Sequence, residues 1–203
     1  MRKLYLATRN AGKVREFQQL LAGSNFEPVR FDGYAEPEEG SASYAENAAL
    51  KARALAEQLR TAGIAGAVLG DDSGLEVAAL GGRPGVLSAR YGGPSATWAS
   101  RRTQLLAEIA ASGSADRRAR FVCALAYIYT GGSRLSVEEH VDGVIGERVR
   151  GAEGFGYDPL FVYEPAGRTF AELPEEEKNN VSHRGRAVRT LLERITIELP
   201  RNA

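Results

Sequence analysis

The fold is decided first at residues 4–13, Leu4-Tyr5-Leu6-Ala7-Thr8-Arg9-Asn10-Ala11-Gly12-Lys13, where an apolar run gives way to a helical pattern. Leu4–Thr8 predicts a short buried strand, and Asn10 is a residue type that caps helix N-termini. The apolar residues between Val14 and Leu21 then recur at helical spacing. This stretch therefore predicts a strand that leads directly into a helix.

The alternation continues along the chain and ends in a hairpin. We predict further helices at 43–59, 95–109 and 182–195, strands at 67–69, 121–129, 135–141 and 160–162, and loops at 81–85 and 150–159. Gly131-Gly132 is a turn signal, so the strands on either side of it predict an antiparallel pair. Alternating strands and helices followed by a hairpin indicate an α/β fold with a mixed sheet. We expect a single domain over residues 1–203.

The composition excludes several classes of protein. Lys and Arg number 26, Asp and Glu number 26, and the formal net charge is +0. Phosphate polymers and anionic membranes are bound through accumulated positive charge, so no stable nucleic-acid or membrane partner is expected. The single cysteine, Cys123, cannot form an internal disulfide and fits a reducing compartment. The longest uncharged run, Phe121–Ser133, has 13 residues, whereas a membrane-spanning helix needs about 20. We expect a cytoplasmic protein.

The junction at Thr8–Lys13 has the features of an anion site. Backbone N–H groups and the positive end of a helix dipole favour an anion at the start of a helix. Thr8 and Asn10 can donate to phosphate oxygens, Gly12 permits close approach to the backbone, and Lys13 adds a positive charge. The spacing does not match a P-loop. An ordinary capped helix with a surface lysine fits the same residues.

The acidic candidates follow the apolar run Ala67-Val68-Leu69, in the segment Asp71-Asp72-Ser73-Gly74-Leu75. Neighbouring side chains on a strand point to opposite faces, so both carboxylates reach one site only if the strand has ended. We expect one to face a ligand at the strand end and the other to be structural. Mg²⁺ binds one or two carboxylates and completes its shell with water and substrate phosphate. Glu39 is a candidate second ligand, and an Asx-turn is the alternative for the Asp segment.

Three further segments carry candidate ligand-binding residues. Asn47 and Lys51 share one helix face, and Lys51 is either a phosphate contact or a solvated charge. Two aromatic residues each follow a glycine in Gly154-Phe155-Gly156-Tyr157-Asp158-Pro159, where they stack on a planar base or fold back into the core. Hydrogen-bond donors near a helix N-terminus are offered by Lys178 and Ser182-His183-Arg184. The alternative is that the serine caps the helix and the charged residues are exposed.

Taken together, these segments resemble the inosine/xanthosine triphosphate pyrophosphatases, the family that clears non-standard purine nucleotides. The resemblance runs from Leu6 to Leu192, and Arg9 stands where members often carry glycine. It is carried by the residue runs Ala7–Lys13, Glu46-Asn47-Ala48 with Lys51-Ala52, Asp71–Leu75, Gly82–Gly85 with Ser88–Tyr91, Gly154–Pro159 and Ser182–Arg184.

The resemblance implies an elongated mixed sheet with flanking helices, two lobes around a central cleft, and a homodimer. It implies Mg²⁺-dependent hydrolysis of ITP, dITP or XTP to the monophosphate and pyrophosphate. Asp72 is the implied catalytic base and metal ligand, with Glu39 as a second metal ligand. The implied substrate contacts are, for the triphosphate, Thr8, Arg9, Asn10, Ala11, Gly12 and Lys13, then Ser73, and, for the base and sugar, Phe155, Gly156, Tyr157, Asp158, Lys178, His183 and Arg184.

Two other functions fit the same residues. One is a pyrophosphatase for modified pyrimidine nucleotides, and the other is a nucleotide-binding protein without catalysis. The balanced charge disfavours a DNA-associated protein, and an acidic residue beside a complete phosphate loop disfavours a protein that only binds.

Overall fold

The computed structural model describes residues 1–40, 43–129, 132 and 134–198. In this part of the chain, eight strands hydrogen-bond in the order β2-β1-β3-β5-β6-β7-β8, and β4 pairs with β3. β1 is parallel to β2 and β3, whereas the β3–β4, β6–β7 and β7–β8 pairs are antiparallel. The mixed sheet of an α/β fold is therefore confirmed. The strands are β1 (Arg2–Ala7), β2 (Phe26–Val29), β3 (Ala67–Val77), β4 (Pro84–Gly85), β5 (Arg118–Ile128), β6 (Arg134–Ile145), β7 (Phe161–Tyr163) and β8 (Arg168–Thr169).

The helices are α1 (Ala11–Leu20), α2 (Tyr44–Thr61), α3 (Trp98–Ala111), α4 (Glu175–Val181) and α5 (His183–Glu198). None of the described helices is long and apolar enough to cross a membrane. The chain divides into two compact units, the first comprising 1–72, 123–139 and 184–203, and the second comprising 73–122 and 140–183. The single domain and the cleft between two lobes stay predictions.

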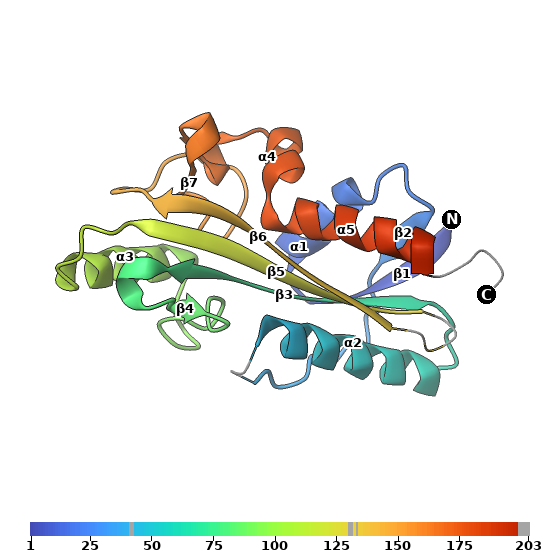
Figure 1. The fold of residues 1–203 in the computed structure, drawn as a ribbon. Helices are drawn as coiled ribbons and strands as arrows, with labels where there is room; N and C mark the ends of the chain where they lie inside the picture. Colours follow the sequence, from blue (N-terminus) through green and yellow to red (C-terminus); the bar gives the residue numbers. More distant parts are fainter. Residues whose placement is uncertain (41–42, 130–131, 133, 199–203) are drawn as a thin grey trace. The chain divides into compact units, whose positions relative to one another are not determined.

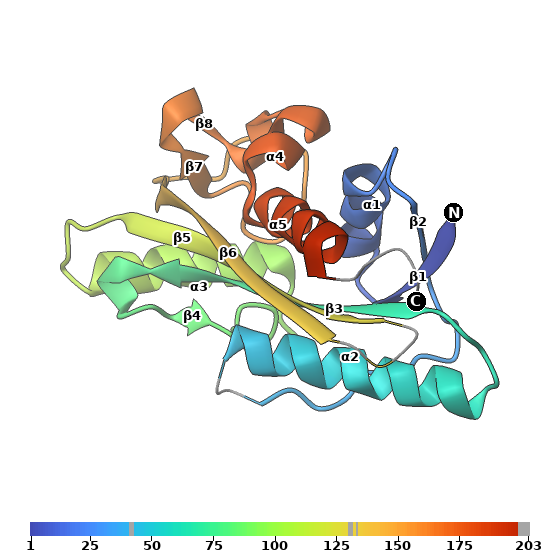
Figure 2. The ribbon, with the colours of Figure 1, turned by 45° about the vertical axis from the view of Figure 1, so that its right-hand side comes forward.

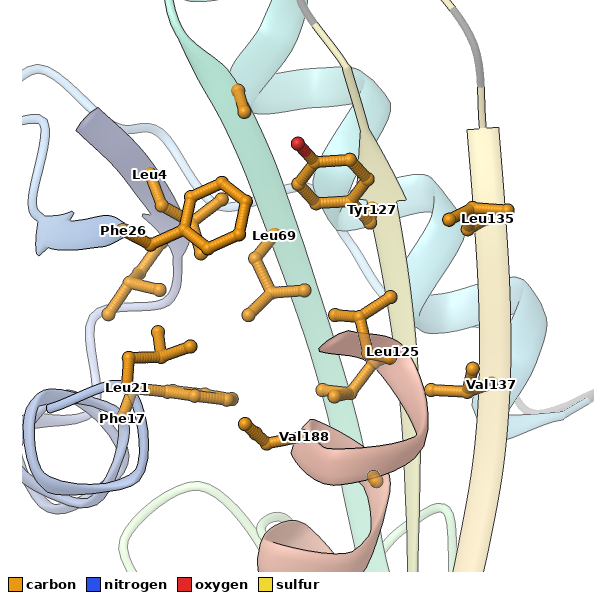
Figure 3. Close-up of a cluster of buried hydrophobic side chains, with 14 of the residues drawn as sticks. Leu4, Phe17, Leu21, Phe26, Leu69, Leu125, Tyr127, Leu135, Val137 and Val188 are labelled. Atoms are coloured by element: carbon orange, nitrogen blue, oxygen red, sulfur yellow. The ribbon is translucent and has the colours of Figure 1, made fainter. Parts of the chain in front are cut away.

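The core of the first unit lies under α1 and α5. Figures 1 and 2 show these two helices on one face of the strands and α2 on the opposite face. Phe17 from α1 and Val188 from α5 are buried against Leu69 and Leu125, as Figure 3 shows. Burying apolar side chains of this size contributes about 1.5–3 kcal/mol each, so this cluster fixes both helices on the sheet.

α2 lies unusually close to β3, and a glycine permits it. A Cβ atom at Gly70 would lie 2.1 Å from the carbonyl oxygen of Ala48 and 2.9 Å from the amide nitrogen of Ala52. Ser43 caps α2 by accepting a hydrogen bond from the Glu46 amide at 3.1 Å. The close approach brings Lys51, which lies between Ala48 and Ala52 in sequence, against the backbone of β3.

The second unit has its own core around α3. Leu105 and Ile109 of α3 are buried with Leu75 of β3, Phe121 of β5 and Phe161 of β7. The aromatic rings of Phe121 and Phe161 lie 4.7 Å apart. The loop 150–159 passes over this unit without a helix or strand, as predicted.

Several predicted boundaries were wrong. β3 does not end before Asp71 but continues through both aspartates to Val77. α3 begins at Trp98 with Thr97 as its cap, not at Ser95. Pro84–Gly85, which was predicted as loop, forms β4. The loop was expected because Gly and Pro are poor strand formers, but here the pairing with β3 overrides their propensity.

Other elements had no prediction. β2, β8 and α4 were not foreseen, and β1 begins at Arg2 rather than Leu4. β5 and β6 are neighbours in the sheet. Gly131, in the predicted turn between them, lies outside the described residues.

Candidate active site

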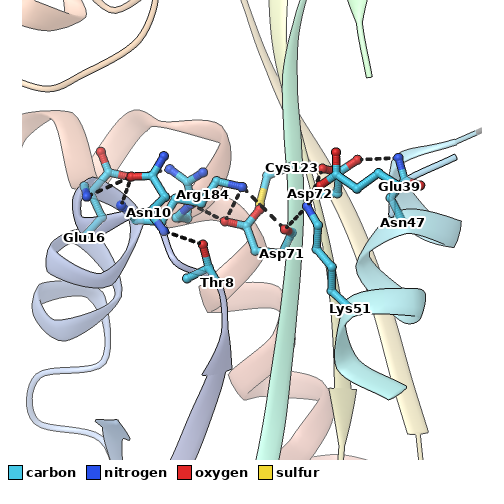
Figure 4. Close-up of polar contacts among 12 residues, drawn as sticks. Thr8, Asn10, Glu16, Glu39, Asn47, Lys51, Asp71, Asp72, Cys123 and Arg184 are labelled. Atoms are coloured by element: carbon cyan, nitrogen blue, oxygen red, sulfur yellow. Dashed lines mark hydrogen bonds and ion pairs between the residues drawn. The ribbon is translucent and has the colours of Figure 1, made fainter. Parts of the chain in front are cut away.

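β3 places two adjacent carboxylates on opposite faces of the sheet. Asp71 and Asp72 are 1% and 4% exposed. Because β3 continues through both residues, their side chains point in opposite directions. In Figure 4, Asp71 points to one side of β3 with Arg184, and Asp72 points to the other with Lys51. Asp72 was predicted at a strand end, whereas it lies within the strand.

Asp72 is held by two side chains of α2. Lys51 Nζ lies 2.9 Å from Asp72 Oδ1, and Asn47 Nδ2 donates to Asp72 Oδ2 at 3.0 Å. Lys51 Nζ also donates to the main-chain oxygen of Asp71 at 3.2 Å and pairs with Glu39. Asn47 and Lys51 share one helix face, as predicted, and that face fixes both oxygens of the Asp72 carboxylate.

The charge state of this cluster follows from burial and pairing. Burial raises the pKa of Asp72, although Lys51, Lys13 and Asn47 all act to lower it. Burial disfavours the ammonium of Lys51, but Asp72 and Glu39 outweigh that effect and the pKa of Lys51 is raised. Asp72 is therefore a stronger base than an exposed aspartate, beside a lysine that stays charged.

Asp72 and Glu39 also fit a divalent cation. Asp72 Oδ1 and Glu39 Oε1 both contact the same cationic atom, Lys51 Nζ, so the two carboxylates already lie within reach of one positive centre. Within the described ranges, no three His, Cys, Asp or Glu side chains gather into a metal-holding group. Two carboxylates suit Mg²⁺, which takes the remainder of its shell from water and phosphate.

Asp71 joins a second ion network on the opposite face. Arg184 Nε donates to Asp71 Oδ2 at 3.0 Å, and Lys13 Nζ lies 3.4 Å from the same oxygen. Arg184 also pairs with Glu16, and Cys123 Sγ lies 3.8 Å from Asp71 Oδ1. Arg184 was predicted to donate to a purine base, but two of its nitrogens serve carboxylates here.

The loop between β1 and α1 is partly self-satisfied. Asn10 Oδ1 accepts from the amides of Gly12 at 2.9 Å and Lys13 at 3.2 Å, so its predicted capping role is confirmed. Thr8 is buried, and its Oγ1 accepts from the Asn10 amide at 3.1 Å. The amides of Gly12 and Lys13, expected to face an anion, are thus used by Asn10. Arg9 and Ala11 are exposed, as a ligand-facing loop requires.

In the second unit, Asp158 gathers two of the predicted base-binding residues. Asp158 Oδ2 accepts from Lys178 Nζ at 2.7 Å and from the Phe155 amide at 2.8 Å. Lys178 Nζ lies 5.2 Å from the centre of the Phe155 ring. Asp158 and Lys178 are buried, whereas Phe155 is half-buried.

The remaining predicted residues divide between core and surface. Tyr157 is 2% exposed and its hydroxyl donates to the Ser88 carbonyl at 3.3 Å, so its ring folds back into the core. Gly156 beside it is buried, and Ser73 is half-buried. His183 stacks on Phe121, with ring centres 4.7 Å apart and planes 12° apart.

Sequence reasoning missed contacts between distant parts of the chain. Glu16 meets Arg184 across 168 positions, and Arg102 donates to the Gly156 carbonyl across 54. Lys51 was considered only as a phosphate contact or a surface charge, not as the partner of Asp72. The available signal was the shared helix face of Asn47 and Lys51. It indicated that the two side chains are neighbours, but it did not identify Asp72 as their partner.

The chain matches a known protein family and is similar to members of known sequence. The model of the Ham1 family matches residues 4–194. The chain is 46% identical over 198 residues to the dITP/XTP pyrophosphatase of Methylococcus capsulatus, covering 96% of each protein. It is 48% identical over 193 residues to a dITP/XTP pyrophosphatase of Thermus thermophilus, covering 94% of this chain and 90% of that one.

Solved structures agree with this match. A HAM1 protein from Coxiella burnetii superimposes with a TM-score of 0.85 at 37% identity, covering 97% of this chain and 100% of that one. A nucleoside-triphosphatase / dITP/XTP pyrophosphatase from Mycobacterium abscessus gives a TM-score of 0.69 at 40% identity, covering 93% and 97%.

Proposed function

The chain belongs to the Ham1 family, and on that premise we propose that it hydrolyses non-standard purine nucleoside triphosphates, dITP and XTP among them, to the monophosphate and pyrophosphate. The observation that carries the proposal is the buried Asp72 carboxylate, fixed by Lys51 and Asn47. A carboxylate with a raised pKa beside fixed positive charge suits the activation of water next to phosphate.

Asp72 is the base of the proposed reaction. Water attacks the α-phosphorus, Asp72 takes a proton from that water, and a new P–O bond forms. The bond from the α-phosphorus to the bridging oxygen breaks, and pyrophosphate leaves. Lys51 and Asn47 hold the Asp72 carboxylate in one orientation. Little of the free energy of substrate binding is therefore needed to align this carboxylate with the attacking water.

Positive charge for the triphosphate comes from Lys13 and from Mg²⁺. Lys13 Nζ lies 3.4 Å from Asp71 Oδ2 and also donates to the main-chain oxygen of Asp71 at 3.4 Å, the same oxygen that Lys51 Nζ contacts. Its charge therefore lies near Asp72, although the Asp71 carboxylate points to the other face of the sheet. We propose Asp72 and Glu39 as the side chains that hold Mg²⁺, which supplies charge to the phosphate oxygens when bound. Positioning and charge neutralisation are most of what phosphoryl transfer requires.

Recognition of the purine base and formation of a homodimer are parts of the same proposal. The proposed contacts of the base and sugar are Phe155, Lys178, His183 and Arg184, as the family resemblance implies. Donors aimed at the 6-carbonyl of hypoxanthine or xanthine would face the amino group of adenine unpaired, which discriminates by about 10⁴-fold at such sites. We also propose a homodimer in the cytoplasm, as the family resemblance implies.

The test is a panel of triphosphates with Mg²⁺, in which pyrophosphate is scored against orthophosphate. The proposal predicts pyrophosphate from dITP, ITP and XTP and little from dATP, whose amino group stands where the 6-carbonyl would be. Faster turnover of modified pyrimidine triphosphates, or binding without hydrolysis, would contradict it.

The metal ligands are tested by a pair of neighbouring acids. Glu39→Gln raises the Mg²⁺ concentration for half-maximal activity, while Glu38→Gln, at an exposed position, leaves it unchanged. An equal response in the two variants would remove Glu39 from the site.

A further inference from the structure

The loop Gly154–Asp158 is held in place from two directions. On one side, Asp158 binds the Phe155 amide and Lys178, as described above. Gly154 and Gly156 have φ values of +70° and +64°, a backbone region that side-chain-bearing residues rarely adopt. The loop therefore has a specific conformation that contacts outside it must maintain.

The other side of the loop rests on α3. Arg102 Nη1 donates to the Gly156 carbonyl at 2.8 Å. The Trp98 ring packs edge-on against Tyr157, with centres 5.5 Å apart and planes 81° apart. A Cβ atom at Gly156 would lie 3.7 Å from the Trp98 ring. Trp98 and Arg102 are one helical turn apart, so they present one face of α3 to the loop.

The hydrogen bond from Arg102 to the Gly156 carbonyl involves a charged donor. A hydrogen bond from a guanidinium to a carbonyl is charge-assisted and exceeds a neutral one. Among the described residues, Arg102 Nε is buried and finds no hydrogen-bond partner. The guanidinium thus loses part of its solvation while it donates to the Gly156 carbonyl. Its hydrogen-bonding capacity is used to hold the loop and is not fully satisfied by other partners.

We propose that Trp98 and Arg102 are positioning residues that hold the loop Gly154–Asp158 in the conformation that binds the base. This inference rests on the proposed function. If only a fraction of molecules has the competent loop, the apparent affinity falls by that fraction. Loss of the Arg102 contact therefore weakens binding of the nucleotide, while the step at Asp72 keeps its rate once the nucleotide is bound.

Steady-state kinetics with dITP test the inference. Arg102→Ala raises KM about tenfold, as the loss of a charge-assisted bond predicts, and leaves kcat within about twofold. Arg102→Lys keeps a charged donor and raises KM about threefold. The control, Arg53→Ala, removes the same charge from an exposed position of α2 and changes neither constant.

A second readout needs no turnover. Trp98 is the single tryptophan of the sequence, so its fluorescence reports on the environment of Tyr157 and the loop. Titration with dIMP shifts the Trp98 emission in the wild type, and Arg102→Ala moves the midpoint about tenfold higher, in step with KM.

The outcomes separate the two proposals. The positioning role is overturned by an unchanged KM in either Arg102 variant, or by a fall in kcat as large as the rise in KM. It is also overturned if the Trp98 emission of the wild type does not change when dIMP binds. Absence of dITP and XTP turnover in the wild type overturns the proposed function instead. If Arg102→Ala does not fold, Arg102→Lys and its fluorescence titration decide.

Discussion

Lys51→Met isolates the charge that compensates Asp72 and Glu39. Methionine keeps most of the buried stem and removes the ammonium. At 2.9 Å from Asp72 Oδ1, a unit charge contributes about 6 kcal/mol at an effective dielectric constant of 20, and desolvation of the ammonium offsets part of that. Removing one partner of a buried pair costs roughly 3–5 kcal/mol because the other charge stays buried. We expect that loss in the free energy of unfolding.

The loss depends on pH in a defined direction. Burial already raises the pKa of Asp72, and removal of Lys51 raises it further. A carboxyl whose pKa is raised by folding favours the folded state at low pH and loses that contribution as pH rises through the folded pKa. The cost of Lys51→Met is therefore largest at neutral pH and shrinks as Asp72 becomes protonated.

Urea unfolding across a pH series measures both effects. Arg53→Ala, an exposed change on the same helix, is the control and should stay within about 0.5 kcal/mol of the wild type. A Lys51→Met loss below about 1 kcal/mol at neutral pH, or one that grows on acidification, would refute the reasoning about the pair.

Two further substitutions and one labelling experiment test the first unit. Asn10→Ala removes the cap that bonds the Gly12 and Lys13 amides and should cost about 1 kcal/mol in urea unfolding; an unchanged midpoint would argue against the cap. Glu16→Gln takes a charged partner from Arg184 and should cost about 1–3 kcal/mol, while the exposed Glu27→Gln should cost little. Cys123 is 0% exposed, so a thiol reagent should modify it no faster than the chain unfolds, and rapid labelling of folded protein would place it elsewhere.

Local signals in the sequence were enough for the cap of α1 but not for that of α3, where Thr97 and not Ser95 precedes the helix. Asn10 was predicted as a cap from residue type alone, because capping depends on contacts within one turn. The same locality identified Asn47 and Lys51 as neighbours on one helix face.

The strand through Asp71 and Asp72 could not be predicted from local preference. Asp and Gly are depleted in strands, yet β3 continues through Asp71 and Asp72, from its pairing with β1, which ends at Gly70, to its pairing with β4, which begins at Leu75. β2 was missed because it is four residues long and contains Pro28, which an edge strand tolerates. The polar composition of α4 hides its periodicity.

The sequence named candidate site residues but not their pairings. The family resemblance supplied Asp72, Lys13 and Arg184, whereas the division of Asp72 toward Lys51 and Asp71 toward Arg184 depends on tertiary structure. Spacing along the chain carries no information about a contact such as Glu16–Arg184, which only the packing of α5 against α1 creates.

The role of Asp72 is tested most directly by turnover of dITP in the wild type and in Asp72→Asn, with binding of dITP measured on both. Asparagine keeps the size of the side chain and removes its basicity. We predict pyrophosphate and dIMP from the wild type, and retained binding with at least about a 10²-fold loss of kcat, the usual contribution of a general base, in the variant. Near-normal pyrophosphate release by Asp72→Asn would contradict the account.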